Sequence, residues 1–206
     1  MSISTLLRES SRTEHKEAES SKFIVELMRG QLNLEAYTRY LVNLGWLYKA
    51  LEQMVATGEP FPTSEPIWDF RLSRLQSISN DIEALGVVDW QNTTVPSSAM
   101  KSYIAHLESL KGKADPRLVA HHYTRYLGDL SGGQAIASLV ARNYQATPDQ
   151  LTFYKFDEID DLVRFKESYR SNLDSLELSN DQVAELVSEV RLAFEFNQKV
   201  FEDLAR

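Results

Sequence analysis

Two residues near the start of the sequence have the spacing of a metal ligand and a supporting hydrogen-bond acceptor. His15 lies one helical turn before Glu19, so on a helix the carboxylate can accept the second ring N–H while the first nitrogen binds a metal ion. The same spacing also suits an exposed ion pair with no metal. The pattern by itself therefore leaves two interpretations open, a metal ligand and a surface histidine beside an acid.

Three of the eight glycines lie together at positions 128, 132 and 133, between flanks with helical periodicity. Each glycine inside a helix costs about 1 kcal/mol relative to alanine, so this cluster indicates a close contact. Gly128 and Gly132 are four residues apart and share a helix face, where the absent Cβ atoms would let a flat ligand approach the backbone. A close helix–helix crossing or a kink explains the spacing as well.

A carboxylate stands inside this glycine cluster. Asp129 follows Gly128 directly, and beside a bare backbone its side chain can hold ordered water or take part in a proton-transfer chain. The alternative is an ordinary solvent-facing aspartate, because Asp residues are mostly exposed in proteins. Asp129 is thus a candidate catalytic residue if the glycines line a site.

The remaining histidines show no chelating pattern. His121 and His122 are adjacent in the sequence, so on a helix they point in different directions and cannot bind one ion from one face. His106 stands alone between apolar neighbours, which favours a packed side chain with one hydrogen bond. We interpret the adjacent pair as structural or exposed residues and His106 as a packing residue.

Basic residues occur in two groups that suit an anion. Arg8 begins a series of cations at four-residue spacing on the first predicted helix, and Lys166 and Arg170 share a face of a later one. Next to an apolar cavity such side chains bind carboxylates. A solvated helix face is the ordinary explanation of the same pattern.

The composition narrows the classes of protein. The 206 residues include no cysteine, which excludes disulfides, thiolate metal sites, iron–sulfur clusters and a cysteine nucleophile. A net charge of -8 argues against a nucleic-acid partner. No stretch approaches the roughly 20 apolar residues of a membrane span, and the first residues lack the apolar core of a secretory signal. We therefore expect a cytoplasmic protein with no membrane or nucleic-acid partner.

Apolar residues recur at three- and four-residue spacing in long stretches without proline, which predicts an all-α fold in a single domain over residues 1–206. Capping residues and glycines indicate where the helices end. The predicted helices cover residues 3–19, 23–28, 33–55, 66–85, 97–111, 115–144, 157–176 and 179–204, with a loop at 59–66 and a short turn at 147–148. No segment shows the alternation of a β-strand.

Four segments resemble the haem oxygenases, in particular the soluble bacterial kind that is similar to the mammalian catalytic domain. The most specific is HYTRYLGDLSGGQ at residues 122–134, which resembles the family's distal-helix signature almost letter for letter. EHKEAE at 14–19 resembles the proximal motif, FKESYR at 165–170 the propionate-binding segment, and FEFN at 194–197, with Phe201, the last helix. The resemblance covers nearly the whole chain. It implies a multi-helix domain that holds haem between a proximal and a distal helix.

The resemblance also implies roles for individual residues. His15 is then the iron ligand and Glu19 the acceptor for its second N–H. Asp129 is the catalytic residue that organises the water that delivers protons, and Gly128 and Gly132 leave room beside it. The other implied haem contacts are Arg8, Tyr123, Gly133, Lys166, Arg170, Phe194, Asn197 and Phe201.

The implied reaction converts haem b to biliverdin, expected as the alpha isomer, with CO and Fe2+ as the other products. It uses O2 and electrons from a separate reductase or ferredoxin, and we expect the chain to act as a monomer. At position 8 this chain has arginine where relatives often have lysine, which keeps the charge but alters the geometry of a propionate contact.

Two other classes of function remain. A haem carrier or sensor needs only a histidine ligand and a pocket, but it has no use for an aspartate among the glycines. A helical protein of similar fold, such as a thiaminase-like enzyme, binds no haem, yet the active members need a cysteine nucleophile that this chain lacks. Adding haemin, and then reductant and O2, separates the three classes.

Overall fold

Side-chain caps form at the helix starts that the sequence marks. The side-chain oxygen of Asn33 accepts a hydrogen bond from the backbone N–H of Ala36 at 2.9 Å, and Ser179 with Gln182 forms the predicted capping box. Gly30 adopts the left-handed conformation, with φ at 70°, just after a helix ends. These local signals satisfy the free N–H and C=O groups of helix ends.

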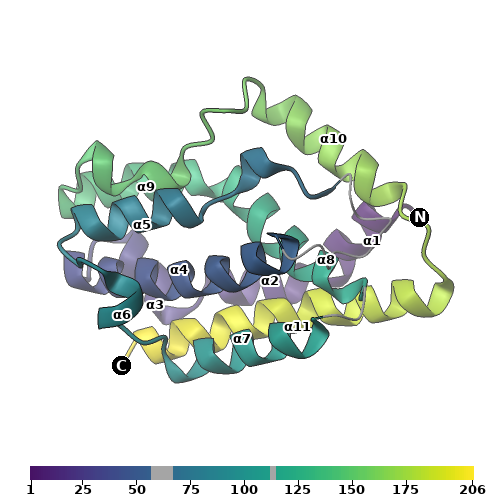
Figure 1. Ribbon diagram of the computed structural model, residues 1–206, viewed down its shortest axis with the longest axis horizontal. Coiled ribbons are helices and arrows are strands. Elements are labelled where there is room, and N and C mark those ends of the chain that lie inside the picture. Colours follow the sequence, from purple (N-terminus) through teal and green to yellow (C-terminus); the bar gives the residue numbers. More distant parts are fainter. Residues whose placement is uncertain (57–66, 112–114) are drawn as a thin grey trace.

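The computed structural model describes residues 1–56, 67–111 and 115–206, most of which are helical (Figure 1). The all-α prediction is confirmed, because no residue in these ranges belongs to a strand. None of the described helices has a stretch long and apolar enough to cross a membrane. The predicted loop at 59–66 lies outside the described residues. The α-helices are α1 (Ile3–Ser10), α2 (Arg12–Glu19), α3 (Lys22–Met28), α4 (Leu34–Ala56), α5 (Leu75–Ala84), α6 (Trp90–Thr93), α7 (Ser98–Leu110), α8 (Arg117–His122), α9 (Gly128–Tyr144), α10 (Leu162–Asp174) and α11 (Asn180–Leu204).

The single helix predicted over residues 3–19 is two helices, α1 and α2, which meet at Ser11. The Ser11 side chain is buried, and its hydroxyl donates to the backbone carbonyl of Leu7 at 2.7 Å. A serine side chain that bonds the backbone in this way competes with the helical hydrogen-bond pattern. α2, which carries His15, therefore begins as a separate helix.

Two other predicted helices are shorter in the structure. Of the predicted helix over residues 66–85, the structure describes 67–85, and within that range only 75–84 are α-helical, because Asp69 caps a short 3₁₀ turn, Phe70–Leu72, ahead of α5. Of residues 157–176, only 162–174 are helical. Asp161 accepts hydrogen bonds from the N–H groups of Val163 and Arg164, both at 3.0 Å, and so starts α10. The aspartate cap therefore sets the start of α10 at residue 162, although apolar residues at helical spacing also occur before it.

The segment predicted as a helix over residues 115–144 contains an irregular turn. α8 and α9 are joined by a π-helical turn, Tyr123–Leu127. A π turn holds an additional residue, so side chains after it are rotated relative to those of a regular α-helix. This turn therefore affects which residues of the glycine cluster face the interior.

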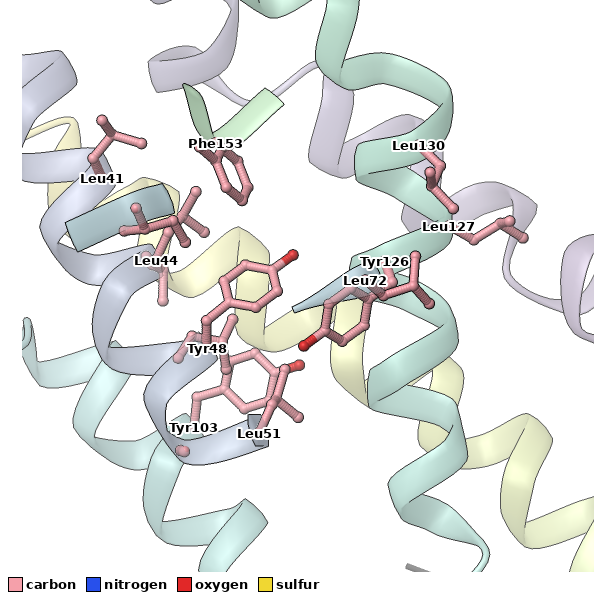
Figure 2. Packing of buried hydrophobic residues seen from close by; sticks show 14 of the residues in the cluster. Leu41, Leu44, Tyr48, Leu51, Leu72, Tyr103, Tyr126, Leu127, Leu130 and Phe153 are labelled. Carbon is pink, nitrogen blue, oxygen red and sulfur yellow. The ribbon is translucent and has the colours of Figure 1, made fainter. Parts of the chain in front are cut away.

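α11 lies at the centre of the helix packing. It contacts α1, α2, α3, α7 and α8, and in Figure 1 it runs beside α7. α4 packs on α5 and α7. Figure 2 shows Tyr48 of α4 beside Tyr126 of the π turn, with ring centroids 5.2 Å apart. α11 also contacts the π turn, so α2 and the beginning of the glycine-rich helix are held against one scaffold.

Candidate functional site

A pocket opens between α2, the start of α9 and α11. α2 contributes His15 and Glu19, and the helix after the π turn contributes Gly128, Asp129 and Gly132. From α11, the lining residues are Phe194, Asn197 and Phe201. The pocket is open to solvent and has a volume of about 180 Å³, smaller than the roughly 300–1,000 Å³ of typical ligand pockets, so a large flat ligand would extend beyond it. The fold thus brings together residues of three separate sequence motifs.

His15 lines the pocket with one ring nitrogen turned to a carboxylate. Its Nδ1 lies 3.6 Å from Glu19, long for a direct hydrogen bond but close enough for electrostatic attraction. The His15 ring meets Phe194 edge-on, with centroids 5.3 Å apart. Because Nδ1 faces Glu19, Nε2 is the nitrogen available to a metal ion. The His15 side chain is 52% exposed, so the fold does not depend on its burial.

Gly128 and Gly132 form another wall of the pocket, where the helix backbone is not covered by side chains. A Cβ atom built at either position meets no described atom within 4 Å. The alternative explanation of a close helix–helix crossing therefore does not hold at these two positions, because no other helix in the described part of the chain packs against them. The space beside them is open to a flat ligand, which a side chain would obstruct.

Gly133 has a different neighbour. A Cβ atom at this position would lie 3.2 Å from Cδ1 of Tyr154, closer than an ordinary van der Waals contact. Gly133 is buried, and it is not part of the pocket lining. The structure thus places Gly133 in contact with Tyr154, away from the open wall that Gly128 and Gly132 form.

Asp129 belongs to a buried polar network and does not face solvent. Its side chain is 11% exposed, and its Oδ1 accepts a hydrogen bond from the guanidinium of Arg125 at 3.1 Å. Tyr48 donates a hydrogen bond to the other carboxylate oxygen. Arg125 also donates to the side-chain oxygen of Asn197 at 3.3 Å. The network joins α4, the π turn, the start of α9 and α11 at one carboxylate of the pocket.

The electrostatics around Asp129 suit a group that handles protons. Burial raises the pKa of Asp129 above its usual value, while the charge of Arg125 and the hydrogen bond from Tyr48 oppose this rise. Arg125 Nε and the Thr124 hydroxyl are buried without a hydrogen-bond partner among the described residues, and both residues line the pocket. Buried donors without a partner are costly. They therefore indicate a place for ordered water or a polar ligand atom.

Sequence reasoning alone does not identify two members of this network. Arg125 carries a usable signal, because it precedes Asp129 by four residues and an i,i+4 pair can meet on a helix. Tyr48 carries none, since 81 positions separate it from Asp129 and only the packing of α4 brings them together.

The predicted carboxylate-binding residues Arg8, Lys166 and Arg170, and the implied haem contact Tyr123, are not among the residues that line the pocket. Burial raises the pKa of Tyr123, and the positive charges of Arg170 and Arg8 act in the opposite direction. Arg8 is exposed and pairs with Glu9 at 3.1 Å. Lys166 lies one turn before Arg170 on α10 and is half-buried. The positive charges of Arg8 and Arg170 thus both act on Tyr123.

The adjacent histidines are both buried and point in different directions, as predicted. His121 hydrogen-bonds to Glu189 at 2.8 Å, whereas His122 hydrogen-bonds to Tyr169 at the same distance. His106 also makes a hydrogen bond to Glu189, so its interpretation as a packed residue with one hydrogen bond is confirmed. None of the three histidines lines the pocket around His15.

Several known proteins that are similar to this chain are described as heme oxygenases. The family described as "Heme oxygenase" matches residues 1–203. A heme oxygenase of Porphyra purpurea is 36% identical over 204 residues, which cover 98% of this chain and 86% of that protein. Heme oxygenase-1 of the cyanobacterium Synechocystis, solved in complex with heme, has a TM-score of 0.93 at 30% identity and covers 99% of this chain and 92% of that one. The structure of heme oxygenase from Leptospira interrogans has a TM-score of 0.91 at 32% identity and covers 98% of each chain.

Proposed function

This chain belongs to the haem oxygenase family, and from this membership we propose that it cleaves haem b to biliverdin, CO and Fe2+. It does so as a monomer, with O2 and with electrons from a separate reductase or ferredoxin. The observation that carries the proposal is the pocket that His15 shares with the bare Gly128 and Gly132 and with the buried Asp129. A carrier needs a ligand and a pocket, whereas a carboxylate beside unpartnered buried donors equips the site for proton delivery.

The donor set fits haem on the His15 side of the pocket. A neutral imidazole would hold the iron through Nε2, and Glu19 would keep the proton on Nδ1 and orient the ring. When bound, haem is both the substrate and the group that reacts with O2, and an imidazole ligand favours O–O cleavage less than a thiolate does. Phe194 would limit rotation of the His15 ring through their edge-on contact.

The glycine wall and Asp129 would serve the other face of the ring. Gly128 and Gly132 would let the ring lie directly against the helix backbone, since no side chain intervenes. Each carboxylate oxygen of Asp129 accepts one hydrogen bond from the protein, which leaves lone pairs that can hold water. The unpartnered Thr124 hydroxyl could fix the same water. Asp129 would then orient the water that passes protons to the reacting ligand.

The experiment that tests this function adds haemin to the purified chain and then supplies a reductant and O2. We expect a histidine-ligated absorption spectrum, followed by loss of the haem bands and formation of biliverdin, CO and Fe2+ in equal amounts. Chromatography of the extracted pigment identifies the product. Haem that stays intact through repeated reduction would support a carrier, and failure to bind haemin would contradict both functions.

Gly132→Leu is expected to remove most of the haem turnover and to leave the fold intact. Since a Cβ atom at position 132 meets no described atom within 4 Å, leucine should stabilise the helix by up to about 1 kcal/mol. Its side chain would occupy the space in which we place the ring. Turnover and thermal melting of the same preparation provide the measurement.

Gly133→Ala is the matched control for this substitution. Its Cβ would lie 3.2 Å from Cδ1 of Tyr154, and this crowding opposes the gain of up to about 1 kcal/mol from replacing a helical glycine, so we expect less stabilisation than at position 132. Turnover by the folded protein should stay near that of the wild type. The opposite pattern, with Gly132→Leu unstable yet active, would assign Gly132 to helix packing.

Contacts of Arg8 and Arg170 with the two propionates of haem are expected to determine which meso position of the ring is cleaved. Both arginines are exposed, so each guanidinium–carboxylate pair is worth about 1 kcal/mol or less, and the two together are expected to bias two haem orientations by several-fold. We expect the alpha isomer from the wild type and additional beta or delta isomers after joint replacement of both arginines by alanine. Chromatography of the bilins measures the ratio.

Lys166→Ala serves as the comparison for the arginine variant. Lys166 is the other cation that the resemblance assigns to the propionates and lies one turn before Arg170 on α10, so its loss alone should also shift the isomer ratio, but less than the joint loss of the two arginines. A pure alpha product from the double arginine variant would show that the pocket walls, not the propionate contacts, orient haem.

A further inference from the structure

A second group of metal-ligating side chains lies where α7, α8 and α11 meet, outside the pocket around His15. His106, His121 and Glu189 each offer one ligand atom, and these atoms all lie within 4.8 Å of one another. Nε2 of both histidines hydrogen-bonds to the same oxygen, Oε1 of Glu189. Two imidazole nitrogens and one carboxylate oxygen form a donor set that divalent first-row transition metals take in proteins.

We propose that His106, His121 and Glu189 bind one divalent first-row transition-metal ion, with Zn2+ as the representative ion. Zinc–ligand bonds of about 2.0–2.2 Å place the ligand atoms of a tetrahedral ion about 3.3 Å apart. Nε2 of His121 and Oε1 of Glu189 are now 2.8 Å apart. This pair therefore needs to separate by about 0.5 Å to admit the ion, and no two of the three ligand atoms are more than 4.8 Å apart.

Tyr103 supplies the outer partner that metal-binding histidines ordinarily have. Its hydroxyl lies 3.0 Å from Nδ1 of His121. With a metal on Nε2, the ring proton resides on Nδ1, and the hydroxyl oxygen of Tyr103 accepts it. The neutral imidazole thus changes tautomer without losing a hydrogen bond on this side.

The ionisation states of the two buried ligands also suit a metal ion. Burial lowers the pKa of His121, which favours the neutral imidazole. Burial alone would raise the pKa of Glu189, but the hydrogen bonds from His121 and His106 outweigh it, and the pKa is lowered. Neutral histidine and ionised carboxylate are the forms that bind metals.

An ion can reach this site from the His106 side. The side chain of His106 is 22% exposed, whereas those of His121 and Glu189 are 0% and 6% exposed. Arg117 is a nearby cation that acts on His121, but it is paired with Asp115 at 2.6 Å. A bound ion would link three helices, and one of them, α8, continues into the π turn of the haem pocket.

The test uses the full-length chain after treatment with a chelator, without haem. Calorimetric titration with Zn2+ should show that one ion per chain binds at this site. Titration with Co2+ should give the visible absorption bands of an ion with nitrogen and oxygen ligands. Zn2+ at about 100 times its Kd should raise the Tm by about 5–10 °C. X-ray absorption of the zinc-loaded protein should show two imidazole ligands and one carboxylate.

His106→Gln should abolish this binding with little loss of fold, because its side chain is the most accessible of the three. His15→Ala is the matched control, since it removes a histidine–carboxylate pair elsewhere and should bind the ion at this site as the wild type does. The proposal is overturned if the wild type binds neither ion, or if folded His106→Gln binds Zn2+ with unchanged affinity. An X-ray absorption spectrum of the zinc-loaded wild type that shows fewer than two imidazole ligands also overturns the proposal, without the need for a variant.

Discussion

His15→Ala is expected to lower biliverdin formation by more than about 100-fold. Loss of the hydrogen-bond partner of a metal ligand costs up to about 100-fold, and this substitution removes the ligand itself. The fold should persist, since the His15 side chain is 52% exposed and surface substitutions change stability by about 0.5 kcal/mol or less. Turnover and circular dichroism on the same sample test both parts.

Two further measurements sharpen the His15 prediction. Added imidazole should restore part of the activity of His15→Ala by occupying the place of the ring, and Glu19→Gln should lose about 10–100-fold because the orienting carboxylate is gone. Full activity of His15→Ala without imidazole would refute its assignment as the iron ligand.

Asp129→Ala is expected to retain haem through His15 and to lose nearly all biliverdin formation. Removal of the carboxylate releases the water that it would orient, so O–O cleavage should compete and the variant should oxidise an added phenolic dye as a peroxidase does. Stability should fall by about 3–5 kcal/mol, because the buried guanidinium of Arg125 loses its partner. The measurement is the yield of biliverdin and of oxidised dye per haem.

Tyr48→Phe is the graded control for Asp129. It removes one hydrogen bond to the carboxylate and leaves the ion pair with Arg125, so we expect a loss of about 1 kcal/mol of stability and an intermediate biliverdin yield. If folded Asp129→Ala makes biliverdin at the wild-type rate, its proposed role in orienting water is wrong.

Local signals account for most of the agreement between the predicted and observed helices. Asn33 and Ser179 cap the helices that they precede, because capping depends on side chains a few residues apart. The errors have local causes too. The side chains of Ser11 and Asp161 hydrogen-bond to nearby backbone groups. Such bonds compete with the helical hydrogen bonds, and hydrophobic periodicity carries no information about this competition.

The candidate site was predictable to the extent that its residues lie in one motif. The spacing of Gly128, Asp129 and Gly132 pointed to a bare helix face with a carboxylate, and all three line one pocket. Gly133 stands in the same motif but contacts Tyr154. The π turn before Gly128 rotates the helix that follows, and hydrophobic periodicity does not reveal such a turn.

The sequence by itself determined the helical architecture, the pairing of His15 with Glu19 at one-turn spacing, and the glycines that bare one helix face, because each follows from residues within a few positions. Only the tertiary structure decided which neighbours those residues meet. Tyr48 reaches Asp129 across 81 positions, and His106 and His121 share a carboxylate from α11. Such contacts depend on how whole helices pack. Several helices have apolar faces, and only their packing in three dimensions decides which of these faces meet.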